Sequence, residues 1–188
     1  MSNRNDGTGK IQMIKIFDDV LEPHVAELID MQLREVSWKY NYDSVKDGVN
    51  KHWHVFCGHN PQECHDNGYG DLIPIWNAIK NRNPKLEMER VYLNAHTHGI
   101  EPHRHIDEGA YTIIYYPRLD WKQAWGGGTF VENDIDSFTE LSEDIFIDYK
   151  GNRMIMFTAS NPHQAQAVSR QCYELRTCVV FKTIVKKD

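Results

Sequence analysis

The chain has 188 residues, of which 40% are hydrophobic and 26% are charged, and both values are typical of a single soluble globular domain. Its formal net charge of −6 disfavours a nucleic-acid-binding protein, because such proteins usually carry a basic surface. No run of about 18 apolar residues is present, so we expect no membrane-spanning helix. The start of the chain, MSNRNDGTGK, lacks the apolar core of a signal peptide. We therefore expect residues 1–10 to form a mobile tail, the protein to be cytoplasmic, and the four cysteines to be reduced thiols.

The N-terminal part of the domain, residues 11–89, combines a strand, two helices and an aromatic-rich loop. Residues 13–17 are typical of a short strand. Pro23 suits the first turn of a helix, and apolar side chains recur after it at helical spacing: Val25, Leu28, Ile29, Leu33 and Val36. Residues 38–70 are irregular and rich in aromatic side chains. Asp71 is a candidate N-cap for a second helix with one apolar face: Leu72, Ile75, Trp76 and Ile79.

From about residue 90 the pattern changes to short strands rich in Val, Ile, Tyr, Phe and Thr. We expect strands at residues 90–97, 103–108, 111–117, 128–132, 145–149, 153–158, 163–168 and 174–184. Eight short strands separated by turns are typical of a jelly roll. We predict a mostly β fold with N-terminal helices (α+β), in which helices flank a double-stranded β-helix core at residues 90–184. The chain 1–188 would then be one domain.

His105 and Asp107 are candidate metal ligands on the expected strand 103–108. Residues i and i+2 of a strand point to the same face, so the pair would direct one nitrogen and one oxygen ligand to the same point. His163 begins another expected strand. Two histidines and one carboxylate form the facial triad of non-haem Fe(II) oxygenases, which leaves open positions on the metal. The alternative is that His105 and Asp107 are exposed hairpin residues and His163 is structural.

Four segments make the second half of the chain resemble the 2-oxoglutarate/Fe(II) dioxygenases, and among them the prolyl 4-hydroxylase-like branch. PHRHIDEGAYTIIYYPRLDW is similar to that family's iron-binding strand and the strand after it. WGGGTF is similar to its Gly-Gly turn, and DYKGNRMIMF to the strands that lead to the distal histidine. NPHQAQAVSRQCYELRTCVVFK is similar to the distal histidine and the following strand, which carries an arginine. The segments occur in the family's order.

The resemblance implies a role for each matching residue. His105, Asp107 and His163 would bind Fe(II), and Arg176 would pair with the far carboxylate of the co-substrate 2-oxoglutarate. Tyr116 would donate a hydrogen bond to the same carboxylate. Strand alternation agrees, because Arg176, Cys178, Val180 and Lys182 share one face, as do Thr112, Ile114 and Tyr116. Arg176 lies further from His163 than the usual nine or ten residues, so Arg170 is a rival.

The resemblance also implies a reaction in which O2 and 2-oxoglutarate are consumed, succinate and CO2 are released, and a substrate is hydroxylated. Asp107 favours hydroxylation over halogenation, because related halogenases lack this carboxylate. The substrate would be a peptidyl or free proline, or another peptide or small molecule, and we expect no nucleic-acid or membrane partner. Residues 38–70 would either contact the substrate or form a separate hydrophobic cluster. The sequence does not predict an oligomeric state.

Other interpretations of the same residues remain open. His96, His98 and His103 lie near the candidate pair in sequence and are rival metal ligands. A cupin-like jelly-roll metalloprotein could use the metal without 2-oxoglutarate, but it would not need Arg176. A jelly-roll binding module without catalytic activity would not need to bring His105, Asp107 and His163 together.

Overall fold

The computed structural model describes residues 14–45, 50–136 and 141–186, so the expected tail at residues 1–10 lies outside the described residues. The α-helices are α1 (Pro23–Arg34), α2 (Pro61–Asp66) and α3 (Ile73–Arg82), and the 3-10 helices are η1 (Gly70–Leu72) and η2 (Gln123–Trp125). The strands are β1 (Ile14–Phe17), β2 (Lys39–Tyr42), β3 (His52–Gly58), β4 (Leu86–His96), β5 (Tyr111–Tyr116), β6 (Thr129–Asp136), β7 (Leu141–Ile147), β8 (Arg153–Thr158), β9 (His163–Ala165) and β10 (Arg176–Val185). In the described part of the chain, no helix has the length and apolar character needed to cross a membrane.

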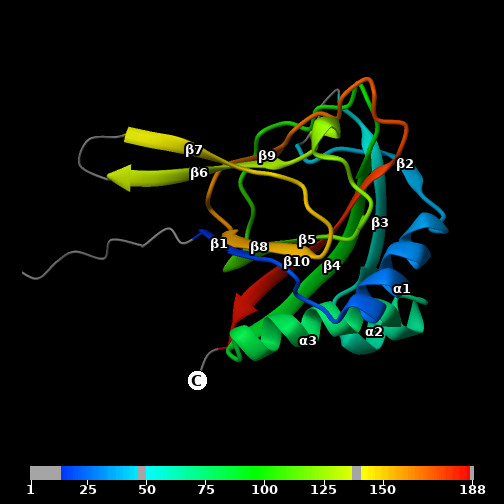
Figure 1. The fold of residues 1–188 in the computed structure, drawn as a ribbon. Coiled ribbons are helices and arrows are strands. Elements are labelled where there is room, and N and C mark those ends of the chain that lie inside the picture. The colour runs from blue at the N-terminus through cyan, green and yellow to red at the C-terminus, as the bar shows by residue number, and fades with distance from the viewer. Residues whose placement is uncertain (1–13, 46–49, 137–140, 187–188) are drawn as a thin grey trace, which may run out of the picture.

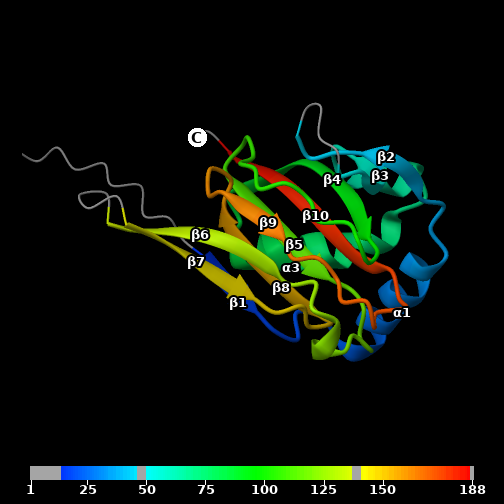
Figure 2. The same ribbon diagram turned by 90° about the horizontal axis from the view of Figure 1, so that it is seen from above.

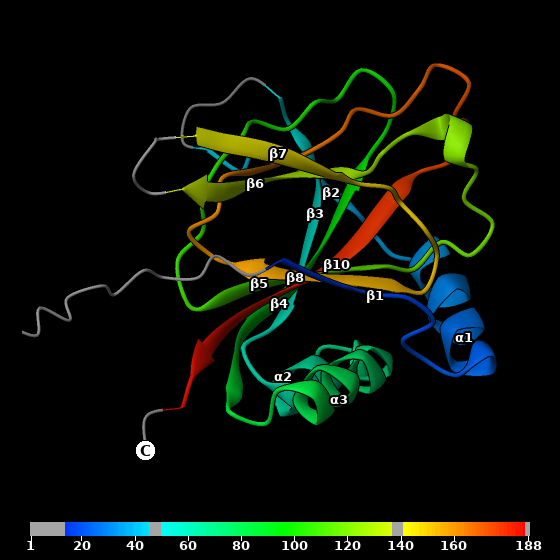
Figure 3. The same ribbon diagram turned by 60° about the vertical axis from the view of Figure 1, so that its left-hand side comes forward.

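The elements form three layers, which Figure 3 shows with the large sheet in the middle. The large sheet has seven strands in the order β1-β8-β5-β10-β4-β3-β2, and the small sheet has the order β7-β6-β9. Neighbouring strands in both sheets are antiparallel. The small sheet lies on one face of the large sheet, and α2 and α3 lie on the other (Figures 1 and 3). The prediction of a jelly-roll core flanked by helices is confirmed.

Strand alternation gives the large sheet two different faces. On β10, Val179 and Phe181 belong to the core cluster that also contains Ile75 and Ile79 of α3. Cys178 and Val180 point the other way, into a second cluster that includes residues of the small sheet. Each face thus buries its own apolar set, and the residues of β10 that share a face with Val180 lie between the two sheets.

Residues 38–70 are more regular than we expected. They contain β2, β3 and α2, so the prediction of an irregular segment was wrong. The Asn60 side chain caps α2 by accepting a hydrogen bond from the Glu63 backbone amide at 3.0 Å, and Pro61 occupies the first turn. On β3 the alternating residues of one face include His52 and His54, which do not form the apolar pattern that signals a strand.

Three smaller expectations were also wrong. Asp71 does not cap the second helix, because it lies within η1 and its carboxylate accepts a hydrogen bond from Gln32 of α1. Leu28 was expected on the buried face of α1 but is 58% exposed, because Ala26, Ile29 and Leu33 define that face. Residues 103–108 do not form a regular strand; His105 alone pairs, through an isolated bridge to His163.

The small sheet covers only part of the large one. Seen from above, β6, β7 and β9 lie toward the β1 and β8 side, while β3 and β2 extend beyond them (Figure 2). Next to this region the His52 ring is fully buried and contacts the rings of Tyr42 and His96, at centroid distances of 5.3 and 4.9 Å. Neither ring nitrogen of His52 has a hydrogen-bond partner among the described residues. Burial therefore lowers the pKa of His52 to about 4.

We predict that His52 makes the protein less stable in mild acid. The unfolded chain binds a proton at His52 near pH 6.5 and the folded chain only near pH 4, so stability is lost as pH falls through this window. The loss from pH 7 to pH 5 should be roughly 2 kcal/mol for this group. His52→Phe keeps a ring in the same place but cannot titrate. Urea unfolding at the two pH values should therefore show a smaller difference for the variant, and equal differences would contradict the prediction.

Candidate metal centre

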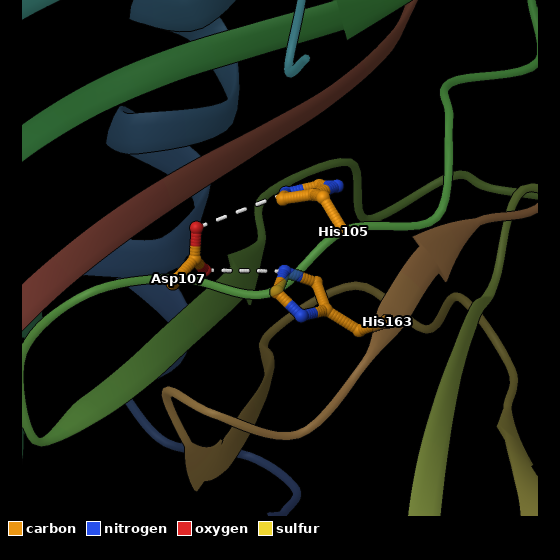
Figure 4. A group of neighbouring side chains, drawn as sticks. All are labelled: His105, Asp107 and His163. Atoms are coloured by element: carbon orange, nitrogen blue, oxygen red, sulfur yellow. Dashed lines mark ion pairs between the residues drawn. The ribbon is translucent and has the colours of Figure 1, made fainter.

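His105, Asp107 and His163 meet at one point although they come from two distant parts of the chain (Figure 4). His105 and His163 exchange two backbone hydrogen bonds, of 3.1 Å from the His105 amide and 2.9 Å from the His163 amide. The Asp107 amide donates to the Ala159 carbonyl at 2.8 Å. The backbone of the loop before β5 is thus fixed to β9 and to the turn after β8, and this pairing sets the positions of all three side chains.

The three side chains present their ligand atoms to one another. One ligand atom from each lies within 4.8 Å of the other two. His163 Nε2 is 3.2 Å from Asp107 Oδ2, and His105 Nε2 is 3.8 Å from Asp107 Oδ1. The two imidazole rings are tilted against each other, with centroids 4.4 Å apart. Two nitrogens and one carboxylate from the protein can occupy one face of an octahedral ion and leave the opposite face open.

The hydrogen bonds of the two rings decide which nitrogens are free. His105 Nδ1 donates to the His103 carbonyl at 2.9 Å, and His163 Nδ1 donates to the Asn161 carbonyl at 2.9 Å. Burial lowers the pKa of both histidines to about 4, so both rings are neutral at pH 7. Each Nε2 then carries a lone pair and no hydrogen, and both lone pairs face the Asp107 carboxylate. These groups repel one another unless a cation lies among them, so the donor set fits a divalent metal ion.

The same site opens into a pocket between the sheets. Residues of β4, β5, β9 and β10 line it, together with His105, and it includes His163, Thr112, Thr129 and Arg176. Arg176 begins β10 and is 1% exposed. Its guanidinium donates to the Gly127 carbonyl at 2.5 Å and lies 3.3 Å from His96 Nδ1. Among the described carboxylates, none forms an ion pair with Arg176.

Tyr116 lies beside Arg176. The Arg176 guanidinium carbon is 5.7 Å from the Tyr116 ring centroid, and the Tyr116 hydroxyl is 2.6 Å from Thr129 Oγ1. The glycine turn before β6 makes room for this arrangement. Gly127 has a φ of +78°, and a Cβ atom there would lie 3.1 Å from Arg176 Cδ. The turn therefore needs glycine for its backbone conformation and for the close approach of Arg176.

The rival residues are not grouped with the three candidate metal ligands. Arg170 is exposed in the loop before β10, whereas Arg176 is buried in the pocket wall. His98 is exposed and its Nδ1 is 3.3 Å from the Val168 carbonyl. His96 is buried against Arg176, and His103 supplies a backbone carbonyl to His105. Among the described residues, no group of potential metal ligands includes these histidines.

Lys182 belongs to the site, although the sequence did not single it out. It is 1% exposed on β10, lines the pocket, and forms an ion pair with Asp107. The Thr112 hydroxyl donates to Asp107 Oδ2 at 2.6 Å, and Lys182 Nζ is 3.0 Å from Thr112 Oγ1. The signal was present in strand alternation, because Lys182 shares a face with Arg176 and Thr112 shares one with Tyr116.

Comparisons with known proteins were made by sequence and by structure. No family model matches the sequence, and no match was found among curated proteins. The structure is similar to a prolyl hydroxylase from Trichoplax adhaerens, solved in complex with a hypoxia inducible factor oxygen degradation domain peptide fragment. Their TM-score is 0.67, with 16% identity over 92% of this chain and 83% of that one.

Two further structures extend the comparison. A prolyl-4-hydroxylase from Pseudomonas putida has a TM-score of 0.66 and 12% identity, with 95% of each chain covered. A non-heme alpha ketoglutarate dependent epimerase from nogalamycin biosynthesis has a TM-score of 0.64 and 14% identity, over 92% of this chain and 79% of that one. The chain therefore has the fold of the prolyl hydroxylases and of other 2-oxoglutarate-dependent non-haem oxygenases.

Proposed function

We propose that this protein is an Fe(II)- and 2-oxoglutarate-dependent oxygenase. In this proposal His105, Asp107 and His163 hold Fe(II), and Arg176 and Tyr116 hold the far carboxylate of 2-oxoglutarate. Bound iron, together with 2-oxoglutarate and O2, supplies the oxidising power for the reaction. The protein binds and orients the reactants and excludes water from the space between the sheets.

The buried charge of Arg176 is the observation that carries this proposal. A buried guanidinium without an anion is unfavourable, because the protein interior does not replace its hydration. Arg176 opens onto the same pocket as His105 and His163, whose free nitrogens can ligate a cation. A dianion with one end on the metal and the other at Arg176 would balance both charges. 2-Oxoglutarate has this form, with a keto acid that chelates a metal and a second carboxylate that matches the planar guanidinium.

The proposed reaction is hydroxylation of a peptidyl or free proline, or of another amino-acid-like or small-molecule substrate, with release of succinate and CO2. Two of the structural neighbours are titled prolyl hydroxylases, and one of these was solved with a peptide fragment. A third is titled an epimerase, so this fold accommodates more than one outcome. The second candidate, a cupin-like metalloprotein with non-oxygenase chemistry, would use the triad but would leave Arg176 without an anion.

We predict that His163→Ala abolishes tight Fe(II) binding. The substitution removes one of three ligands, so the affinity should fall by more than roughly 100-fold, beyond the effect of losing a supporting hydrogen bond. Anaerobic calorimetric titration with Fe(II) measures this change. His98→Ala is the matched control, because His98 is an exposed histidine outside the triad and its loss should leave the affinity unchanged. Similar affinities for wild type and His163→Ala would refute the assignment.

We predict that the Fe(II)-loaded protein binds 2-oxoglutarate through Arg176. Under anaerobic conditions the complex should show the visible metal-to-ligand charge-transfer band of a chelated keto acid. Arg176→Ala should weaken 2-oxoglutarate binding by roughly 10- to 100-fold, since it removes a charge-assisted hydrogen-bond pair. Arg170→Ala changes an exposed arginine in the loop before β10 and should bind like wild type. Absence of the band in folded, iron-loaded protein would favour the cupin-like alternative.

A further inference from the structure

A buried lysine directly contacts the candidate metal ligand Asp107. Lys182 lies on the central strand β10, where its backbone pairs with Arg90 on one side and Thr112 on the other. Its side chain is 1% exposed, and the side chain of Asp107 is 9% exposed. Lysine is almost never buried to this extent without a partner, because its charged head is strongly hydrated in water. The position therefore indicates a specific function for the Lys182 ammonium group.

The contacts of Lys182 concentrate on one atom. Lys182 Nζ donates to Asp107 Oδ2, and the Thr112 hydroxyl donates to the same oxygen at 2.6 Å. Thr112 Oγ1 is 3.0 Å from Lys182 Nζ, so the two donors also support each other. The other oxygen, Oδ1, faces His105 Nε2 at 3.8 Å. Oδ2 also lies 3.2 Å from His163 Nε2, so both oxygens face a candidate ligand nitrogen. The two oxygens still differ, because Oδ2 accepts hydrogen bonds from two side chains, whereas none of the described side chains donates one to Oδ1.

We propose that Lys182 is a positioning residue that limits Asp107 to a single metal-ligating oxygen. The inference rests on the function proposed above. An octahedral ion has six positions, and three protein ligands leave three for small molecules. If Asp107 used both oxygens, only two positions would remain, and a chelating keto acid would fill both. By holding Oδ2, Lys182 keeps the third position free for O2.

Two other roles for Lys182 explain these observations less well than a positioning role. One is a purely structural ion pair, and the other is a direct contact with the co-substrate. A buried ion pair contributes little net stability compared with apolar residues of similar volume, so stability alone does not account for a lysine here. Arg176 already provides a buried cation without a carboxylate partner among the described residues. Lys182, in contrast, is paired with Asp107. Its donor is therefore engaged in holding a ligand.

The test uses Mn(II) alone. This ion has the same coordination preference as Fe(II) and is visible by electron paramagnetic resonance. Line broadening in water enriched in oxygen-17 counts the water molecules on bound Mn(II). Wild type should retain three waters on the metal. Lys182→Met, which is similar in length but has no donor, should retain two because Asp107 then binds through both oxygens. Lys182→Leu provides a second apolar variant in case the methionine variant does not fold, and circular dichroism checks both.

Two more variants make the result specific. Lys182→Gln restores a neutral donor at nearly the same length and should return the count to three waters. Thr177→Val removes a buried hydroxyl from the opposite face of the same strand and should not change it. Three waters in a folded apolar variant, or two in wild type, would overturn the inference. Failure of wild type to bind Mn(II) at all would instead count against the proposed metal site.

The reaction with O2 gives an independent readout in the iron-loaded protein. When the anaerobic complex with 2-oxoglutarate is mixed with O2, the charge-transfer band should decay at least about tenfold more slowly in Lys182→Met than in wild type. The affinity for 2-oxoglutarate should change little, because Arg176 is intact. A band that fails to form in Lys182→Met, with metal bound, would show that Lys182 binds the co-substrate and would contradict a positioning role.

Discussion

The site depends on a repulsion that the ion pair of Lys182 with Asp107 offsets only in part. Backbone carbonyls bind the Nδ1 hydrogens of His105 and His163, so neither ring can turn a hydrogen toward Asp107. The paired backbone of the two histidines prevents the rings from moving apart. Neutral imidazoles and a carboxylate are thus held with their lone pairs directed at the same space. A cation in this space changes the repulsion into attraction, and this supports the proposal that the three residues bind a metal ion.

Strand β10 connects this constraint to the rest of the molecule. On one of its faces Val179 and Phe181 pack toward the helices, so the strand is fixed in the centre of the large sheet. The other face carries Arg176 near one end and Lys182 near the other, and both line the pocket. Burial of two cations is unfavourable unless each meets an anion or a strong acceptor. Asp107 meets this need for Lys182, while the hydrogen-bond partners of Arg176 among the described residues are a carbonyl, an imidazole and a thiol.

Short segments rich in β-forming residues and separated by turns were sufficient to predict the jelly roll, because most core strands bury an apolar face and are bounded by turns. The proximity of His105 and Asp107 also followed from local spacing, yet the expected strand does not form around them. Pro102 has no amide hydrogen to donate, Ile106 is 63% exposed, and the backbone bonds switch from His163 to Ala159 within two residues. The ion pair of Lys182 with Asp107 was not predictable, since it joins residues 75 positions apart and depends on how β5 and β10 pair.

Helix α1 is also connected to the site, through ion pairs as well as through apolar packing. Arg118, which follows β5 and is 3% exposed, pairs with Asp30 of α1 at 3.1 Å and with Glu174 at 2.7 Å. Glu174 lies two residues before Arg176, so the same arginine connects the helix, the end of β5 and the start of β10. Breaking a buried pair of this kind leaves an uncompensated charge, which is more costly than the loss of a surface ion pair. The ion pairs of Arg118 therefore hold the end of the pocket that contains Arg176. The backbone pairing of His105 and His163 holds the other end, which contains the candidate metal ligands.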